Sequence, residues 1–319
     1  MDILIIHIGA GIHDQKLTHK YKSLLRNALS KQSVLESSKI IESSSLTNTG
    51  YGSSLNLLGK VECDASFIIN DNINEEESRI GSLVNMNCKF PILELFQVFN
   101  KIDELYNYES DLTPPIMLSY PNLKNFLNGE VIEDHKELIS PKSQRIYDLY
   151  KDKVFKDKKL PNGISDTIGV IHLENNTTTI ASSSGGNLFK LPGRIGCAGI
   201  IGASIAFNKF EDVKISCMCS GNGEQIIRYK LAQLLVENIY NYMEDNYGEC
   251  IDNLLCRLPV PLYIGFIVVI ETLERVQLLY GHTTESFHFG FRVAKDKTKV
   301  ILSYAEQEGK LTFGEYILA

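Results

Sequence analysis

Asp166-Thr167-Ile168-Gly169-Val170 is the stretch at which the character of the chain changes, and the fold of its second half follows from it. Before it, residues 140–166 carry scattered lysines and the segment Leu160-Pro161-Asn162-Gly163, which predict an exposed and mobile stretch. After it, strands at about 167–174 and 177–183 are expected to meet at a polar turn. A threonine between a loop and a buried strand is, on its own, an ordinary strand start.

Apolar residues elsewhere repeat with the spacing of strands or of helices. Strands are expected at residues 3–8, 61–69, 213–219, 262–271, 276–280 and 287–293, the last three as an antiparallel meander. Helices are expected at residues 16–31, at 91–106, after Arg194 and after Glu224. Because strands and helices come in blocks without strict alternation, the sequence favours sheets packed between helix layers.

The composition is that of an ordinary globular protein. The chain has 319 residues, 44% of them hydrophobic, which is enough for one large core or two modest ones. A net charge of -7 argues against a nucleic-acid-binding surface. The most apolar later stretches, 196–207 and 260–270, are too short to span a membrane. We therefore expect a soluble protein with neither nucleic-acid nor membrane partners.

The cysteines and the first residues bear on the compartment. The seven cysteines show no zinc-ligand pairing, and reduced, buried thiols are the simplest interpretation. The chain begins without the basic segment and apolar run of a signal peptide. Both observations favour a cytoplasmic or nuclear location. The lysines of residues 151–159 fit a solvated helix face better than a nuclear-import signal.

Four further motifs stand in a fixed order around the central threonine. They are His7-Ile8-Gly9-Ala10-Gly11, Thr47-Asn48-Thr49-Gly50-Tyr51-Gly52, Ser183-Ser184-Gly185-Gly186 with Pro192-Gly193-Arg194-Ile195-Gly196, and Ser220-Gly221-Asn222-Gly223-Glu224. In this order they resemble the plant-type asparaginase family, which comprises isoaspartyl aminopeptidases, glycosylasparaginases and taspase (threonine aspartase). The resemblance covers about residues 4–70 and 164–303, and it is weak between them.

Two details resemble the taspase branch of that family. Residues 56–66 (NLLGKVECDAS) and 281–286 (GHTTES) are similar to taspase segments nearly letter for letter. The residue before the threonine is Asp166, where the asparaginases usually have glycine. The resemblance therefore implies a threonine-type endopeptidase that cleaves itself between Asp166 and Thr167 and then cuts protein substrates after aspartate.

The residue types suit the chemistry that the resemblance implies. A hydroxyl is a poor nucleophile at neutral pH and needs a base to take its proton. Once Thr167 begins a new chain, its α-amine, with an unperturbed pKa of about 7.7–8.0, can serve as that base. Before scission, Thr167 Oγ would attack the Asp166 carbonyl to give an ester that water hydrolyses. Scission is then also activation.

The resemblance assigns roles to residues of each motif. Ser184 matches a second hydroxyl beside the nucleophile, and Asn48 an active-site amide that polarises a carbonyl or orders water. The remaining matches are the oxyanion-donor turn, Ser220 and Gly221, and the backbone loop that lines the anion pocket, Gly9 and Gly11. Taken singly, each residue also fits an ordinary turn or strand end.

Arg194 is the expected specificity residue, because a guanidinium binds a carboxylate with two hydrogen bonds. An exposed helix arginine is the alternative interpretation. The asparaginases usually place an aspartate three residues later, where it binds the α-ammonium of free asparagine. This chain has Cys197 at that position, which offers no charge to an ammonium. The difference favours protein substrates over free amino acids.

The resemblance implies an α+β fold, a four-layer αββα sandwich of the N-terminal-nucleophile hydrolase type. Residues 1–319 would form a single domain that autoproteolysis splits into an α-subunit, 1–166, and a β-subunit, 167–319. Two such αβ units are expected to pair as a homodimer. No metal or organic cofactor is required, because the nucleophile, base and oxyanion donors are all protein groups.

Two other functions stay open from the sequence. One is an L-asparaginase or isoaspartyl dipeptidase acting on small substrates, against which Cys197 argues. The other is a catalytically weak scaffold that binds Asp-containing partners without cutting them.

Overall fold

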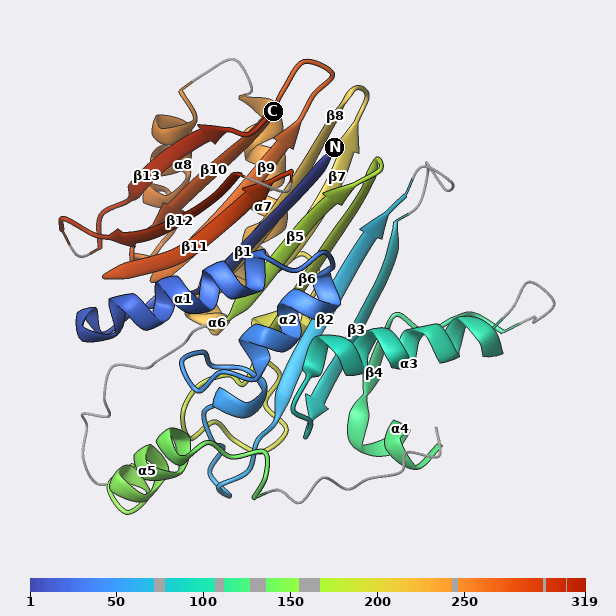
Figure 1. Cartoon of the computed structure of the whole chain (residues 1–319). Helices are drawn as coiled ribbons and strands as arrows, with labels where there is room; N and C mark the ends of the chain where they lie inside the picture. Colours follow the sequence, from blue (N-terminus) through green and yellow to red (C-terminus); the bar gives the residue numbers. More distant parts are fainter. Residues whose placement is uncertain are drawn as a thin grey trace.

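The computed structural model describes residues 1–71, 78–106, 112–126, 136–154, 167–242, 246–294, 297–307 and 309–319. Within these ranges the strands form two sheets (Figure 1). The larger sheet has the order β12 (Lys297–Tyr304), β11 (Ser286–Val293), β1 (Asp2–Gly11), β5 (Ile168–Glu174), β6 (Thr177–Ser184), β2 (Cys63–Asn70), β3 (Arg79–Met86) and β4 (Met117–Ser119). The smaller sheet has the order β13 (Thr312–Ile317), β10 (Val276–His282), β9 (Ile264–Glu271), β8 (Val213–Gly221) and β7 (Ile205–Phe210).

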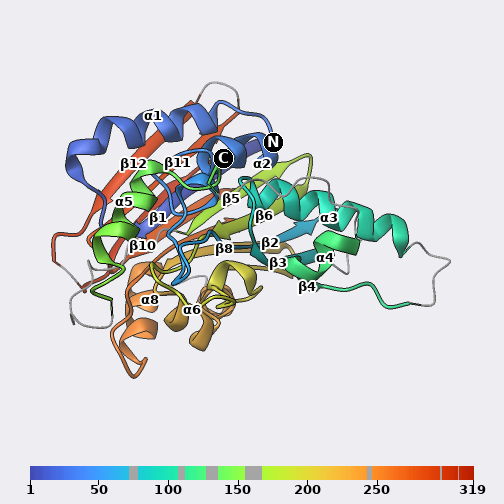
Figure 2. The same cartoon turned by 90° about the horizontal axis from the view of Figure 1, so that it is seen from below.

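Helices cover the outer faces of both sheets (Figures 1 and 2). The larger sheet carries α1 (Thr18–Leu29), α2 (Val34–Glu42) and α3 (Pro91–Leu105), and the smaller carries α6 (Gly223–Tyr229), α7 (Leu231–Asn241) and α8 (Tyr247–Cys256). Two further helices are α4 (Tyr120–Phe126) and α5 (Pro141–Tyr150). No helix in the described ranges combines the length and apolar character that crossing a bilayer requires.

Three apolar cores hold this mixed α/β arrangement together. The first lies between α1–α3 and the larger sheet, the second between α6–α8 and the smaller sheet, and the third between the two sheets. Strand β1 contributes to two of them, because side chains alternate along a strand. Leu4 and Ile6 face the helices, whereas Ile3 and Ile5 face the second sheet. This double burial explains the unbroken apolar run near the start of the chain.

The structure confirms most of the expected strands and helices. The strands expected at 3–8, 61–69, 167–174, 177–183 and 213–219 correspond to β1, β2, β5, β6 and β8. The helix expected at 16–31 is α1, preceded by a short 3₁₀ turn at Gln15–Leu17, and the helix expected at 91–106 is α3. Helix α2 and strands β3, β7, β12 and β13 were not predicted.

The prediction of a helix after Arg194 was wrong. Only a 3₁₀ turn, Cys197–Gly199, forms there, and β7 follows it. Glycine is a poor helix former, and this segment also contains Gly196 and Gly202. Two of its backbone groups, Gly196 N–H and Ala198 O, bind side chains of β2.

The expected meander at the end of the chain was also wrong. Strands β9 and β10 are antiparallel neighbours in the smaller sheet, but β11 pairs with β1 in the larger sheet. Phe287, Phe289 and Phe291 alternate along β11 and pack into the core between the sheets. Their burial there explains why the chain changes sheets after β10.

Two other segments differ from expectation. Residues 141–150, expected to be mobile, form α5, whose Ser143 Oγ donates to Gly52 O at 3.3 Å. Residues 155–166 of the same stretch lie outside the described residues. The helix expected after Glu224 is two helices, α6 and α7, because Lys230 adopts the left-handed conformation with φ 48°.

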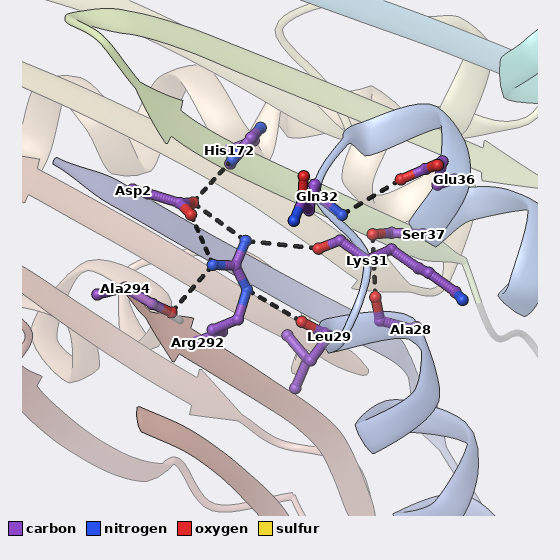
Figure 3. A network of polar contacts seen from close by, with 10 residues as sticks. All are labelled: Asp2, Ala28, Leu29, Lys31, Gln32, Glu36, Ser37, His172, Arg292 and Ala294. Carbon is purple, nitrogen blue, oxygen red and sulfur yellow. Dashed lines mark hydrogen bonds and ion pairs between the residues drawn. The ribbon is translucent and has the colours of Figure 1, made fainter. Parts of the chain in front are cut away.

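An ion pair between a buried arginine and an aspartate whose side chain is 33% exposed fixes the end of the larger sheet (Figure 3). Arg292 on β11 is 4% exposed, and its guanidinium binds both carboxylate oxygens of Asp2 on β1, at 2.6 and 3.0 Å. It also donates to the Leu29 carbonyl at the end of α1, at 3.0 Å. His172 on β5 lies 3.1 Å from the same carboxylate. The Arg292 hydrogen bonds hold the pKa of Asp2 below its usual value.

We expect Arg292→Met to lower the free energy of unfolding by about 2–4 kcal/mol at pH 7, because it leaves a carboxylate and carbonyls without their donor. Lys151→Met is the control, since the Lys151–Asp148 pair is about half exposed. Because the folded-state pKa of Asp2 is lowered, the stabilisation should persist above about pH 4 and fade below it. Urea unfolding of both variants measures this. Equal losses in the two variants would contradict a special role for Arg292.

Candidate active site

Thr167 lies directly before β5 and is almost fully buried, with 3% of its surface exposed. Its backbone N–H donates to Ser220 Oγ at 3.2 Å, and its Oγ1 lies 3.9 Å from Cys197 Sγ. Asp166, the expected residue on the other side of the scissile bond, lies outside the described residues. The structure therefore places the expected nucleophile among polar groups from distant parts of the chain.

Ser220 joins the two sheets at this point. Its Oγ accepts the N–H of Thr167 and also the N–H of Ala10, at 2.9 Å. Thr167 directly precedes β5 and Ala10 lies in the adjacent strand β1 of the larger sheet, whereas Ser220 is next to the last residue of β8 in the smaller sheet. Because Ser220 is fully buried, this oxygen has a defined place between the strands.

The turn at Gly221 requires glycine. Its φ is 128°, and a Cβ there would lie 2.3 Å from the carbonyl oxygen of Tyr263. The next residue, Asn222, caps α6 by accepting the Gln225 N–H, and its own N–H donates to the Tyr263 carbonyl at 2.7 Å. The expected oxyanion turn is thus held between the end of β8 and the start of a helix.

Gly9 and Gly11, the two glycines of the first motif, flank Ala10, whose N–H donates to Ser220 Oγ. The pairing of β1 with β11 shifts register between His7 and Ala10, which marks a β-bulge. Gly9, within this bulge, has φ 106°, and its N–H donates to His7 Nδ1 at 3.2 Å. Gly11 accepts a hydrogen bond from Ser286 Oγ at 3.0 Å. The bulge ends at Ala10, whose N–H donates to Ser220 Oγ.

Ser184 and Asn48 hold neighbouring loops. The pairing of β5 with β6 places Ser184 across from Thr167, and Ser184 Oγ accepts the Gly186 N–H at 3.0 Å. The side-chain amide of Asn48 donates to Gly186 O at 2.8 Å and accepts from Ser54 N at 2.7 Å. In this structure Asn48 therefore positions the loop after β6, a contact that the sequence did not predict.

Arg194 pairs with a carboxylate of its own chain. Its Nε and Nη2 donate to Glu224 Oε1 at 2.9 and 2.7 Å. Its Nη1 lies in a slot between backbones, since Cβ atoms added at Gly186 and Gly196 would be 3.0 and 2.7 Å from it. The guanidinium side chain is 16% exposed. It is a largely buried cation, so the interpretation as an exposed helix arginine was wrong.

Cys197 contributes a neutral group next to Thr167. The residue is 3% exposed, and burial raises the pKa of its thiol to about 11. The thiol therefore carries its proton at pH 7. A substrate ammonium at this position would find no opposite charge on this side chain.

Sequence reasoning assigned no role to three charged residues near Arg194. Glu224 was quoted within its motif, and Asp64 within the segment of residues 56–66, but only as signs of resemblance. Lys190, in the loop before Arg194, is 5% exposed and lies beside the Arg194 guanidinium over Gly186. Their role could have been suspected from the sequence, because these charged residues lie inside or beside the motifs that carry the resemblance.

The histidines near the motifs are buried groups with lowered pKa values. Burial lowers the pKa of His7 to about 3 and that of His288 to about 4. His13 stacks on His288 with ring centroids 4.0 Å apart, and burial also lowers its pKa. A Cβ at Gly169 would lie 2.3 Å from His7 Nε2, so the glycine after Thr167-Ile168 makes room for this imidazole.

These buried imidazoles predict a loss of stability in mild acid. Their folded-state pKa values are lowered below the unfolded value of about 6.5, so the unfolded chain takes up protons first as the pH falls. We expect each such histidine to cost about 1–2 kcal/mol between pH 7 and pH 5. His288→Phe should weaken this dependence in urea unfolding, whereas a substitution of the exposed His19 should not. An unchanged slope in His288→Phe would refute the assignment.

Comparisons with known proteins point to one family. A family model described as asparaginase matches residues 9–269. The plant-type L-asparaginase of Pyrococcus horikoshii is 28% identical over 246 residues, which cover 73% of this chain and 78% of the relative. The isoaspartyl peptidase/L-asparaginase of Bos taurus is 28% identical over 198 residues, 60% of this chain and 58% of the relative. That of Xenopus laevis is 24% identical over 259 residues, 74% and 75% of the two chains.

Proposed function

This chain belongs to the asparaginase family, whose model spans residues 9–269, and we propose that it hydrolyses amide bonds with Thr167 as an N-terminal nucleophile. The observation that carries the proposal is the place of Thr167. It is buried at the start of β5, and its nitrogen is bound to Ser220 Oγ. That nitrogen is the atom that would become the catalytic amine.

The first step would be self-cleavage. Thr167 Oγ1 attacks the carbonyl carbon of Asp166, the bond from that carbon to the Thr167 nitrogen breaks, and the nitrogen takes up a proton. Water then hydrolyses the resulting ester and leaves a free Asp166 carboxylate and a free Thr167 amine and hydroxyl. Ser220 Oγ, 3.2 Å from this nitrogen, supports the step because it holds the leaving atom in place.

Substrate hydrolysis would follow the same chemistry. The Thr167 amine takes the hydroxyl proton, and the Oγ1 attacks the substrate carbonyl. The substrate's carbon–nitrogen bond then breaks, the protonated amine passes its proton to the leaving nitrogen, and water hydrolyses the ester to release the acid and restore Thr167. The turn at Ser220 and Gly221 would place its backbone donors near the developing oxyanion. Arg194 would bind the carboxylate of the substrate's aspartyl group, for which its burial and the slot at Gly186 are favourable.

The finer fold and the subunit division are part of this proposal. We propose that the two sheets and their helices form the four-layer αββα sandwich, split into residues 1–166 and 167–319. Strand β1 of the first piece lies between β11 and β5 of the second, and β2 of the first pairs with β6. The two pieces would therefore stay hydrogen-bonded after the cut. Pairing of two such units as a homodimer stays a prediction.

Two substrate classes are candidates. L-Asparagine and β-aspartyl dipeptides come first, because relatives over most of the chain are named plant-type L-asparaginase and isoaspartyl peptidase. Polypeptides cut after aspartate come second, because Cys197 is a neutral thiol 3.9 Å from Thr167 Oγ1. An internal aspartate carries an amide N–H and needs no counter-charge there.

We expect the purified chain to hydrolyse an aspartyl or asparaginyl amide bond and Thr167→Ala to lose this activity by about 10⁴-fold or more. The substrate panel is L-asparagine, a β-aspartyl dipeptide and a peptide with an internal aspartate, each followed by release of ammonia or of a new amine. Cys197→Ala, which removes the neighbouring thiol and keeps the nucleophile, is the matched control.

The panel separates the alternatives. Turnover of the first two substrates supports the small-substrate function, and turnover of the peptide alone supports the endopeptidase. Equal rates for wild type and Thr167→Ala, or no turnover of any substrate, would contradict the proposal and favour the binding scaffold.

A further inference from the structure

Residues 62–66 face the loop that carries Arg194. Glu62 directly precedes β2, and Asp64 and Ser66 alternate at its start, so the side chains of Asp64 and Ser66 project from the same face of the strand. This Glu-x-Asp-x-Ser pattern lies within the segment that resembles a known sequence motif, but the chemistry proposed above gives it no task. Its contacts show what it holds.

Each of the three residues binds the loop of residues 190–199. Glu62 Oε2 accepts the Gly193 N–H at 3.2 Å, Asp64 Oδ2 accepts the Gly196 N–H at 2.7 Å, and Ser66 Oγ donates to Ala198 O at 2.7 Å. The contacts run in the same order along both segments. The strand therefore serves as a template along which the loop is laid.

The loop needs such a template because it has little structure of its own. Its own backbone hydrogen bonds are those of short turns, in which the Arg194 N–H donates to Leu191 O and the Gly199 N–H to Gly196 O, and the helix expected there does not form. Arg194 stands between the two backbone N–H groups that Glu62 and Asp64 accept. These two carboxyl groups hold the backbone on both sides of Arg194, together with the turn in which the Arg194 N–H donates to Leu191 O.

Asp64 has a second link to the guanidinium. It is fully buried, and a Cβ at Gly196 would lie 2.7 Å from Arg194 Nη1 and 3.3 Å from Asp64 Oδ2. The missing side chain of Gly196 therefore leaves a space that both the Asp64 carboxyl group and the Arg194 guanidinium border. Asp64 Oδ1 also accepts the Asn85 N–H at 3.0 Å, which fixes the plane of the carboxylate. A buried charge held on both oxygens is rigid.

We propose that Asp64 is a positioning residue for Arg194 and thereby sets the preference of the site for substrates with an aspartyl carboxylate. The inference rests on the proposed function of Arg194. Asp64 binds no substrate itself. It fixes Gly196 so that the guanidinium stays in its slot beside Gly186, while Glu224 holds the opposite edge.

The test measures carboxylate binding in Asp64→Asn, which keeps the volume of the side chain but removes its charge and one acceptor. We expect the Kd for free L-aspartate, measured by titration calorimetry, to rise about 10-fold or more. KM for the best substrate of the panel should rise similarly, with kcat within about 3-fold. Ser37→Ala, which removes the buried bond from Ser37 Oγ to Ala28 O, controls for general loss of stability and should leave the Kd unchanged.

A double-mutant cycle separates positioning from a general effect on the fold. If Asp64 acts through Arg194, Asp64→Asn should weaken aspartate binding no further in an Arg194→Ala background. A full additional loss in that background would overturn the proposal, and so would a wild-type Kd in Asp64→Asn. Failure of wild type to bind L-aspartate would overturn it as well.

Glu62→Ala serves if Asp64→Asn does not fold, because Glu62 is only half-buried and loses one contact to Gly193. This variant should raise the Kd for L-aspartate about 3-fold. An unchanged Kd would then overturn the proposal that these residues position the loop of Arg194. Loss of Thr167-dependent turnover with intact aspartate binding would instead count against the proposed function alone.

Discussion

The site depends on one oxygen atom, Ser220 Oγ, which accepts the backbone N–H groups of Ala10 and Thr167. The first donor lies in β1 and the second directly before the adjacent strand β5 of the same sheet, and the acceptor lies near the end of β8 in the other sheet. The three apolar cores fix where the sheets stand, and the bulge in β1 accompanies the Ala10 donor that faces this oxygen. Around it, glycines at 9 and 221 provide backbone conformations that other residues adopt only with strain.

The same architecture makes a cut before Thr167 compatible with an intact fold. In the larger sheet, β1 of the first piece lies between β11 and β5 of the second, and β2 of the first piece pairs with β6 of the second. Arg292 on β11 also binds Asp2 on β1 and the Leu29 carbonyl at the end of α1. Ladder hydrogen bonds, the shared cores and this ion pair would all persist without the peptide bond. Specificity would come from another part of the molecule, the loop that β2 holds at Glu62, Asp64 and Ser66.

The parts that the sequence predicted well are those whose residues carry a local signal. Strand β1 shows the unbroken apolar run of residues 3–6 and β5 is mostly apolar, because both faces of these strands are buried. Thr167, Ser220 and Gly221 stand at or beside strand ends, next to turn residues. The failures share a different cause. The loop after Arg194 is bonded to Asp64, which is far away in the sequence, and the Arg194–Glu224 pair also spans two separate segments. The place of β11 in the larger sheet likewise depends on its pairing with β1, a distant segment that no local pattern reveals.

The central claim is that the nitrogen of residue 167 must be freed before the neighbouring hydroxyl reacts with a substrate. Intact mass spectrometry of freshly purified, active protein, combined with labelling of free α-amines, tests this most directly. We expect the 35.8 kDa chain to be present as two pieces, residues 1–166 and 167–319, with a labelled α-amine on Thr167. The activity should be proportional to the cleaved fraction. Full activity in a preparation whose bond between residues 166 and 167 is intact would contradict it.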